Sequence, residues 1–119
     1  MAGERALLGK GIDLFNAGDF WAAHEAWEEA WTPDRHGPDR GFWKGLIQVA
    51  AGSLHYTRRN RRGALNKWRG GLDYLEPYRP AHRDVDLEPL VAAVSWHVAE
   101  LESGRWPELR LPPLALPDS

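Results

Sequence analysis

The sequence predicts an all-α protein: a five-helix bundle made of two antiparallel helical hairpins and a capping helix, followed by a proline-rich C-terminal tail. Apolar residues recur every three or four positions through most of the chain, which is the spacing of one face of an α-helix. Glycine, proline or a capping side chain stands where this spacing is interrupted. The 119 residues are enough for one domain with a single core.

Two helices joined by a short turn are predicted at the N-terminal end of the chain. The first covers residues 4–17, and Gly18 is a typical stop after it. Asp19 can cap the second helix, over residues 20–31, and Pro33 ends it. Because a tight turn joins them, the two helices should pack antiparallel.

Three more helices are predicted after the loop TPDRHGPDRG, whose two prolines and two glycines break regular structure. Apolar stripes cover residues 42 to 58 or 59, residues 61–76 and residues 87–102. Pro77 ends the helix predicted over residues 61–76, and Gly104 ends the helix predicted over residues 87–102. We therefore expect a single helical domain over residues 1–104.

The last fifteen residues, RWPELRLPPLALPDS, contain four prolines and cannot form a regular helix. Residues 105–119 are therefore predicted to be an extended tail. Its four leucines should either pack back onto the bundle or contact a partner: Leu109, Leu111, Leu114 and Leu116. An apolar tail on a tryptophan-rich bundle also suggests a homodimer.

An internal repeat relates the two predicted hairpins. A displacement of 41 residues aligns four pairs of residues: Gly11 with Gly52, Phe15 with Tyr56, Ala23 with Ala64, and Trp27 with Trp68. A displacement of 86 residues places LESGRW over FNAGDF. A small residue packed against an aromatic one on paired helices weakly resembles the hairpins of tetratricopeptide repeats. In such an architecture each hairpin leaves an apolar face for its neighbour to cover.

The composition excludes several kinds of site and location. Without cysteine, the chain has no disulfides, thiolate nucleophiles or thiolate metal sites, and a reducing cytoplasm is the simplest location. No apolar run approaches the ~20 residues of a membrane span, and MAGERALLGKG lacks the apolar core of a signal peptide. The net charge of −2 gives no overall attraction to nucleic acid or anionic membranes. We expect a cytoplasmic protein that does not enter the membrane.

The stretch FNAGDFWAAHEAWEEAW is dense in both aromatic and titratable side chains. On a helical wheel His24 falls within a stripe of aromatic residues, and Glu28 lies one turn later, near enough to bond its ring. On the next predicted helix, Gln48 and His55 share one face. If the two helices pack through these faces, one polar pocket floored by indole rings should contain seven side chains: His24, Glu25, Trp27, Glu28, Trp31, Gln48 and His55.

Three interpretations of this cluster are open. It could be a purely structural network, because a buried imidazole needs a hydrogen-bond partner. It could be a transition-metal site of a hydrolase, with His24, Glu28 and His55 as ligands and Glu25 as base, although HEAWE has Glu where zinc hydrolases have a second His. It could be a metal-free site for acid–base chemistry or recognition. Our leading hypothesis is a module whose pocket binds a small ligand, a metal ion or a partner's peptide.

A dense positive run lies between the third and fourth predicted helices. It contains Arg58, Arg59, Arg61 and Arg62. Such a run could attract an acidic partner or an RNA backbone. No aromatic residues are interleaved with these arginines and the chain as a whole is nearly neutral, so the sequence argues against nucleic-acid binding.

Several motifs resemble those of the bacterial and archaeal family known as domain of unknown function 309. They are the HExxE pattern at His24, Glu25 and Glu28, the GLIQ of residues 45–48, His55, and the RxNxxGA of residues 58–64. The resemblance covers about residues 11–80 and leaves out the tail. It implies a small all-helical protein without an assigned activity. The family motifs coincide with the cluster found on the helical wheel, which favours one shared site.

Overall fold

The structure, a computed structural model, describes residues 3–117 and contains five α-helices, as the sequence predicts. Two short 3₁₀ helices and a small β-hairpin, which apolar spacing does not predict, complete it. The elements in chain order are α1 (Glu4–Asn16), α2 (Phe20–Trp31), η1 (Thr32–Asp34), α3 (Arg40–Thr57), α4 (Arg61–Leu75), η2 (Glu76–Tyr78), β1 (Ala81–His82), β2 (Val85–Asp86) and α5 (Glu88–Glu102). Between residues 3 and 117, no helix has both the length and the apolar character needed to cross a membrane.

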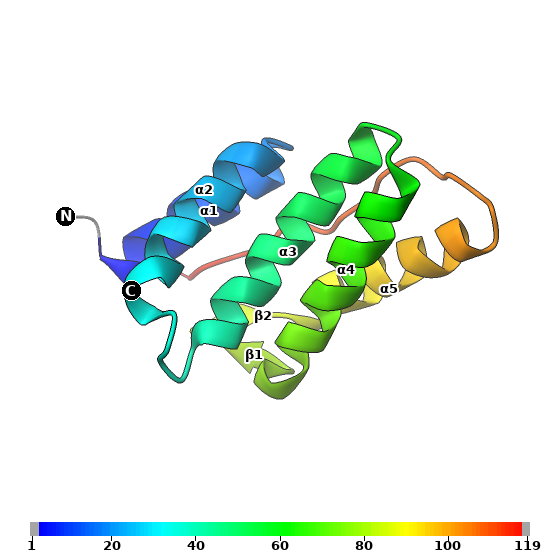
Figure 1. Ribbon diagram of the computed structural model, residues 1–119. Helices are drawn as coiled ribbons and strands as arrows, with labels where there is room; N and C mark the ends of the chain where they lie inside the picture. The colour runs from blue at the N-terminus through cyan, green and yellow to red at the C-terminus, as the bar shows by residue number, and fades with distance from the viewer. Residues whose placement is uncertain (1–2, 118–119) are drawn as a thin grey trace.

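The first four α-helices form two antiparallel hairpins that lie side by side, and α5 lies behind the second hairpin (Figure 1). α2 packs on α1 within its hairpin and on α3 across the junction, while α4 packs on α3 and α5. The side chains buried between these layers form one hydrophobic core that draws on all five helices. This arrangement confirms the predicted all-α bundle of two hairpins and a further helix.

An indole ring packed on a glycine closes each hairpin. A Cβ atom at Gly11 would lie 2.1 Å from Nε1 of Trp27, and a Cβ atom at Gly52 would lie 2.4 Å from Cδ1 of Trp68. Both indoles are fully buried. Each donates its N–H to the carbonyl three residues before the glycine, Trp27 to Leu8 at 3.3 Å and Trp68 to Val49 at 3.2 Å. The 41-residue repeat therefore corresponds to one packing arrangement made twice.

The same left-handed turn ends three of the helices. Gly18 and Gly104 each have φ of 82°, and Arg59 has φ of 58°. In each turn the N–H of the residue with positive φ donates to the carbonyl three positions earlier. The N–H of the following residue donates to the carbonyl five positions before itself. This is the hydrogen-bond pattern of a Schellman cap. Arg59 and Gly104 lie 41 and 86 positions after Gly18, so the sequence repeat extends to the end of α5.

A β-hairpin between α4 and α5 is held against the start of α3 by Asp39. The Asp39 carboxylate accepts hydrogen bonds from Nε2 of His82 at 2.9 Å and from Nε of Arg83 at 2.6 Å. Arg83 also donates to Glu4 of α1 at 2.7 Å. Partial burial raises the pKa of the Asp39 carboxyl, but the bonds from Arg83 and His82 outweigh burial and hold this pKa below its ordinary value.

The tail after α5 has no regular secondary structure and crosses the bundle from α5 back to α1 (Figure 1). Three contacts fix its path. The Tyr56 hydroxyl donates to the carbonyl of Pro107, the Arg110 N–H donates to Nε2 of His97 at 3.2 Å, and Asn16 of α1 exchanges two hydrogen bonds with the backbone of Leu114. Leu114 is buried, and the other three leucines of the tail are partly buried against the core. Of the two predicted alternatives, these leucines pack back onto the bundle.

We expect Gly52→Ala to lower the free energy of unfolding by about 1–3 kcal/mol, the usual cost of overpacking a core. The added methyl group would collide with the fully buried ring of Trp68. Urea unfolding followed by circular dichroism measures the effect. Gly70→Ala on α4 is the control, because its Cβ would meet Gln48 at an ordinary 3.8 Å and alanine favours the helix. Equal destabilisation of the two variants would contradict this packing argument.

Asp39→Asn should make the free energy of unfolding less dependent on pH in the acid range. Because the pKa of Asp39 is lower in the folded state than in the unfolded chain, its carboxylate stabilises the fold above about pH 4, and this contribution is lost as pH falls through the folded-state pKa. We expect a loss of about 2 kcal/mol near neutral pH and a flatter profile of unfolding free energy in acid.

Asp13→Asn is the matched control for this profile. Asp13 is exposed on α1 and forms no ion pair within residues 3–117. Chemical denaturation at a series of pH values should give a wild-type profile for this control. An acid profile of Asp39→Asn that follows the wild type would show that Asp39 is not a source of the pH dependence.

Candidate functional site

The N-terminal half of α2 and the C-terminal half of α3 enclose a pocket of about 250 Å³. The two helices run antiparallel, so the start of one lies beside the end of the other. Both His24 and His55 line the pocket, as the sequence predicts for these two residues. The complete lining is Phe20, Trp21, His24, Ala51, Leu54, His55 and Arg58.

His24 is held in place by stacking rather than by hydrogen bonds. Its ring lies nearly parallel to the indole of Trp21, with an angle of 9° and 5.2 Å between the ring centroids. Nδ1 is buried and has no hydrogen-bond partner within residues 3–117, and Oε2 of Glu28 lies 3.7 Å from it. That separation exceeds a hydrogen bond and leaves an electrostatic contact. Nε2 is therefore the ring nitrogen available to a molecule in the pocket.

His55 is positioned by the residues that begin α4. The side chain of Asn60 caps this helix, because its Oδ1 accepts the N–H of Gly63 at 2.9 Å. Its Nδ2 then donates to Nδ1 of His55, at 3.2 Å. A His55 ring that accepts at Nδ1 carries its proton on Nε2. A Cβ atom at Gly63 would lie 2.7 Å from the ring, so glycine leaves the space that this imidazole occupies.

Arg58 supplies the positive charge of the pocket. It is exposed, and no carboxylate within residues 3–117 pairs with it. Two of its neighbours in the arginine run have other contacts. Arg59 lies over the ring of Trp106, with Cζ 5.1 Å from the centroid, and Arg61 donates to the carbonyl of Leu101 at 3.0 Å. The run therefore does not act as one uniform basic surface.

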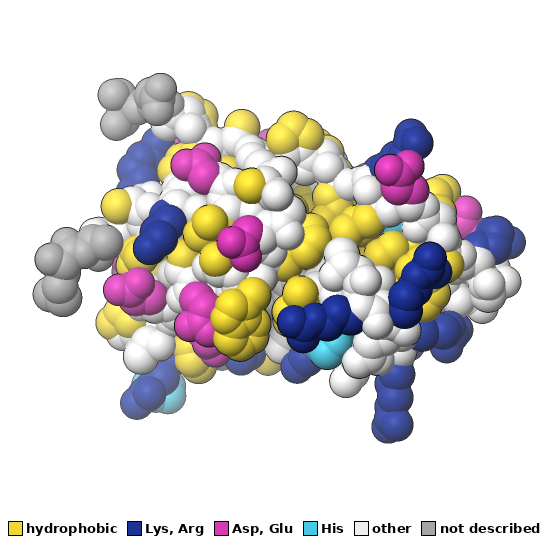
Figure 2. All heavy atoms as spheres, turned by 90° about the horizontal axis from the view of Figure 1, so that it is seen from above, with side chains coloured by type: hydrophobic (Ala, Val, Ile, Leu, Met, Phe, Trp, Pro, Cys, Tyr) yellow, Lys and Arg dark blue, Asp and Glu magenta, His cyan; other side chains and the backbone are white. Residues whose placement is uncertain are grey.

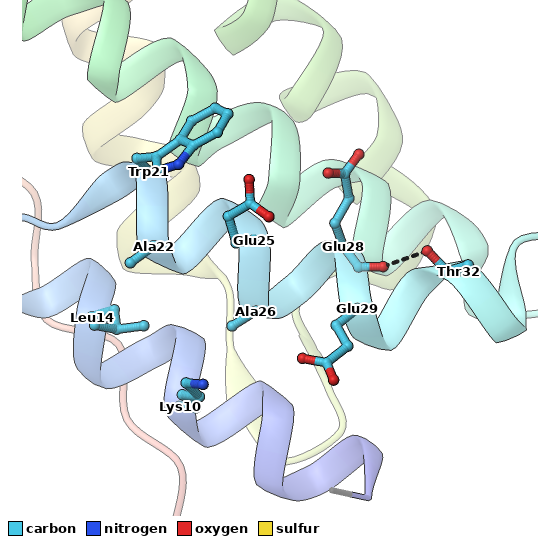
Figure 3. A pocket seen from close by; sticks show the side chains of 9 residues that line it. All are labelled: Lys10, Leu14, Trp21, Ala22, Glu25, Ala26, Glu28, Glu29 and Thr32. Carbon is cyan, nitrogen blue, oxygen red and sulfur yellow. Dashed lines mark hydrogen bonds between the residues drawn. The ribbon is translucent and has the colours of Figure 1, made fainter. Parts of the chain in front are cut away.

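The acidic residues of the HExxE pattern lie on a different surface from the histidine pocket. Glu25 and Glu28 line a shallow hollow of about 570 Å³ between α1 and α2, together with Glu29 and Lys10. In Figure 3, Glu25 and Glu28 rise from the same side of α2 as Trp21, whereas Glu29 extends toward α1. Trp21 lines both spaces, and Glu28, although it lines only the hollow, keeps its Oε2 3.7 Å from Nδ1 of His24.

The other three residues of the predicted pocket serve packing. Trp27 is fully buried against Gly11 in the core between α1 and α2. Trp31 is half-buried at the far end of α2, where Nζ of Lys44 lies 4.8 Å from its ring centroid. Gln48 faces α4, near Gly70. Of the seven predicted side chains, the structure brings His24 and His55 together in this pocket and places the other five outside it.

The proposed metal ligands are not assembled. Within the described residues, 3–117, no three His, Asp or Glu side chains lie in an arrangement that could hold a metal ion. His24 and His55 share a pocket, and Glu28 lies near Nδ1 of His24 but does not line that pocket. The hydrolase interpretation requires at least three ligands around the metal, and this geometry provides no third ligand beside the two imidazoles.

The spacing of residues along α3 indicates pocket residues that the predicted pocket did not include. Ala51, Leu54, His55 and Arg58 are separated by three, four and seven positions, which places them on one face of α3. Arg58 is one turn beyond His55 and belongs to the RxNxxGA motif. Trp21 escaped notice because its position lies off the apolar stripe of α2, and it is 56% exposed.

Comparison with curated proteins finds no match to this chain. The family described as "Domain of unknown function" (DUF309) matches residues 8–66. These residues include the complete lining of the pocket as well as Asn60 and Gly63, and they leave out α5 and the tail. The part of the fold shared with the family is therefore the first hairpin, α3 and the start of α4. The chain belongs to the DUF309 family, whose description assigns no activity.

Proposed function

We propose that this protein is a binding module whose pocket between α2 and α3 takes a small organic carboxylate. The observation that supports the proposal is the convergence of Arg58 and two imidazoles on one hollow with apolar walls. An arginine without an internal ion pair can attract and bond a carboxylate. At about 250 Å³ the pocket is smaller than typical drug-sized sites, which suits a ligand group of a few heavy atoms.

The hydrogen-bond pattern also favours an acceptor as ligand. Nδ1 of His55 already accepts a hydrogen bond from Asn60, so the ring offers a ligand only the Nε2–H donor. Arg58 adds guanidinium donors and has no acceptor. Phe20, Ala51 and Leu54 offer no polar side-chain group, so they suit the hydrocarbon part of the ligand. A carboxylate with a short apolar chain meets both requirements.

A purely structural role for the cluster has less support. A structural imidazole would bond the neighbouring helix, because an unpartnered buried nitrogen costs about 1–3 kcal/mol. His24 makes no hydrogen bond to α3, and its Nδ1 lacks any partner within residues 3–117. The homodimer and the cytoplasmic location inferred from the sequence stay predictions. The pocket is lined by residues of one chain, so the proposal depends on neither.

Butanoate should bind the wild-type protein and shift the NMR signals of His24, His55 and the Arg58 side chain. Arg58→Gln should weaken this binding about three- to tenfold, the effect of removing one partly solvated charge contact. Arg59→Gln is the matched control, since Arg59 lies over Trp106 and does not line the pocket. Absence of butanoate binding, or equal weakening by both variants, would contradict the proposed site.

Gly63→Ala should displace the His55 ring and weaken butanoate binding severalfold without unfolding the protein. The new methyl group would overlap the ring, and the Asn60–His55 hydrogen bond should be lost. Nitrogen NMR of the imidazole reports this directly, because the wild-type ring should be the Nε2–H tautomer and the variant a mixture. Gly70→Ala on the same helix should leave both tautomer and affinity unchanged.

A further inference from the structure

A second cavity, of about 410 Å³, adjoins the pocket. It lies between the α1–α2 turn, the end of α3 and the tail. Viewed from above, Figure 2 shows hydrophobic side chains in a hollow between the two halves of the molecule. The lining consists of Phe15, Asn16, Gly18, Phe20, Thr57, Leu109, Leu111 and Pro113. We call this space the tail cavity, because residues of the tail form one of its walls.

The tail cavity offers an apolar surface although two of its residues are polar. Both ends of the Asn16 amide are occupied: Nδ2 donates to the Leu114 carbonyl at 2.8 Å, and Oδ1 accepts the Leu114 N–H at 2.9 Å. The Thr57 hydroxyl donates to the carbonyl of Leu54 at 2.7 Å. These two polar side chains are bonded internally, and apart from Gly18 the other lining residues are phenylalanine, leucine and proline.

The two spaces meet at Phe20, which lines both of them. On α3 and just after it, Thr57 faces the tail cavity and the next residue, Arg58, faces the histidine pocket. For one molecule to occupy both spaces, it must pass along Phe20 from the side of Arg58 to the side of Thr57. Such a molecule would have its charged end at Arg58 and its hydrophobic end in the tail cavity.

We propose that the natural ligand is an amphipathic carboxylate of medium chain length, with its head at Arg58 and His55 and its hydrocarbon chain in the tail cavity. This proposal rests on the carboxylate site described above and names its ligand class. Charge selects the head, because Arg58 has no internal ion pair within residues 3–117. Burial of methylene groups against Leu109 and Leu111 supplies affinity and selects chain length.

The test is a calorimetric titration of the full chain with butanoate, hexanoate and octanoate, each below its micelle concentration. Transfer of a methylene group out of water corresponds to roughly three- to fourfold in affinity, so octanoate should bind on the order of a hundredfold more tightly than butanoate. Octanol, which lacks the charged head, should bind more weakly than octanoate. Nuclear Overhauser effects should connect the terminal methyl group of octanoate with Leu109 or Leu111.

A matched pair of tail variants locates the hydrocarbon chain. Leu111→Asn changes the wall of the tail cavity, and we expect it to reduce octanoate affinity by tenfold or more while leaving butanoate affinity unchanged. Leu116→Asn makes the same substitution in the same tail, at a residue that packs near Gly9 and does not line this cavity. It should bind octanoate like the wild type. Circular dichroism verifies that both variants remain folded.

The possible outcomes separate the two proposals. Butanoate binding with no gain along the series would overturn the amphipathic ligand and leave the small-carboxylate site intact. Failure of every carboxylate to bind would overturn both. Octanol binding as tightly as octanoate, or octanoate contacts confined to residues outside the tail, would also overturn the present inference. If Leu111→Asn does not fold, the wild-type series and the contacts of the octanoate methyl group decide the question alone.

Discussion

The close approach of an indole ring to a glycine is the constraint on which the rest of this fold depends. In the second hairpin it is reinforced by two further glycines, because a Cβ at Gly45 would lie 2.5 Å from Cγ of Leu75 and one at Gly71 would lie 3.1 Å from the carbonyl oxygen of Gly45. α3 and α4 therefore approach almost backbone to backbone. This contact fixes the rotation of α3 about its axis and so decides which residues of α3 face α2.

The candidate site follows from that rotation. With Gly52 directed at Trp68, the face of α3 that carries Ala51, His55 and Arg58 is left for α2. The turn after α3 then has two functions, since Asn60 both caps α4 and orients the His55 ring. The residues that end one helix and begin the next thus also set the chemistry of the pocket.

The tail forms one wall of the proposed ligand site, although it lies outside the residues that match the family. Its path depends on His97, which is buried and bonded on both nitrogens: Nδ1–H donates to the Ala93 carbonyl at 2.7 Å, and Nε2 accepts the Arg110 N–H. A buried imidazole with both nitrogens satisfied is a stable anchor. The tail lies outside the residues that match the family. The proposed small-carboxylate site therefore lies wholly within the residues that match the family, whereas the proposed selection for chain length depends on a wall formed by the tail.

Local spacing, capping residues and the 41-residue repeat were enough to predict the helices, their antiparallel pairing within each hairpin, and which glycine and tryptophan positions correspond in the two hairpins. The sequence also made His24 and His55 candidates for one pocket, on the condition that α2 and α3 pack through the faces that carry them. Which side chains surround the two histidines depends on how the helices pack in three dimensions. A helical wheel gives directions around one axis, and it carries no information on how two helices rotate against each other. For that reason Glu28, Trp27 and Gln48 lie outside the pocket, while Trp21, Arg58 and the distant leucines of the tail enclose the two adjoining spaces.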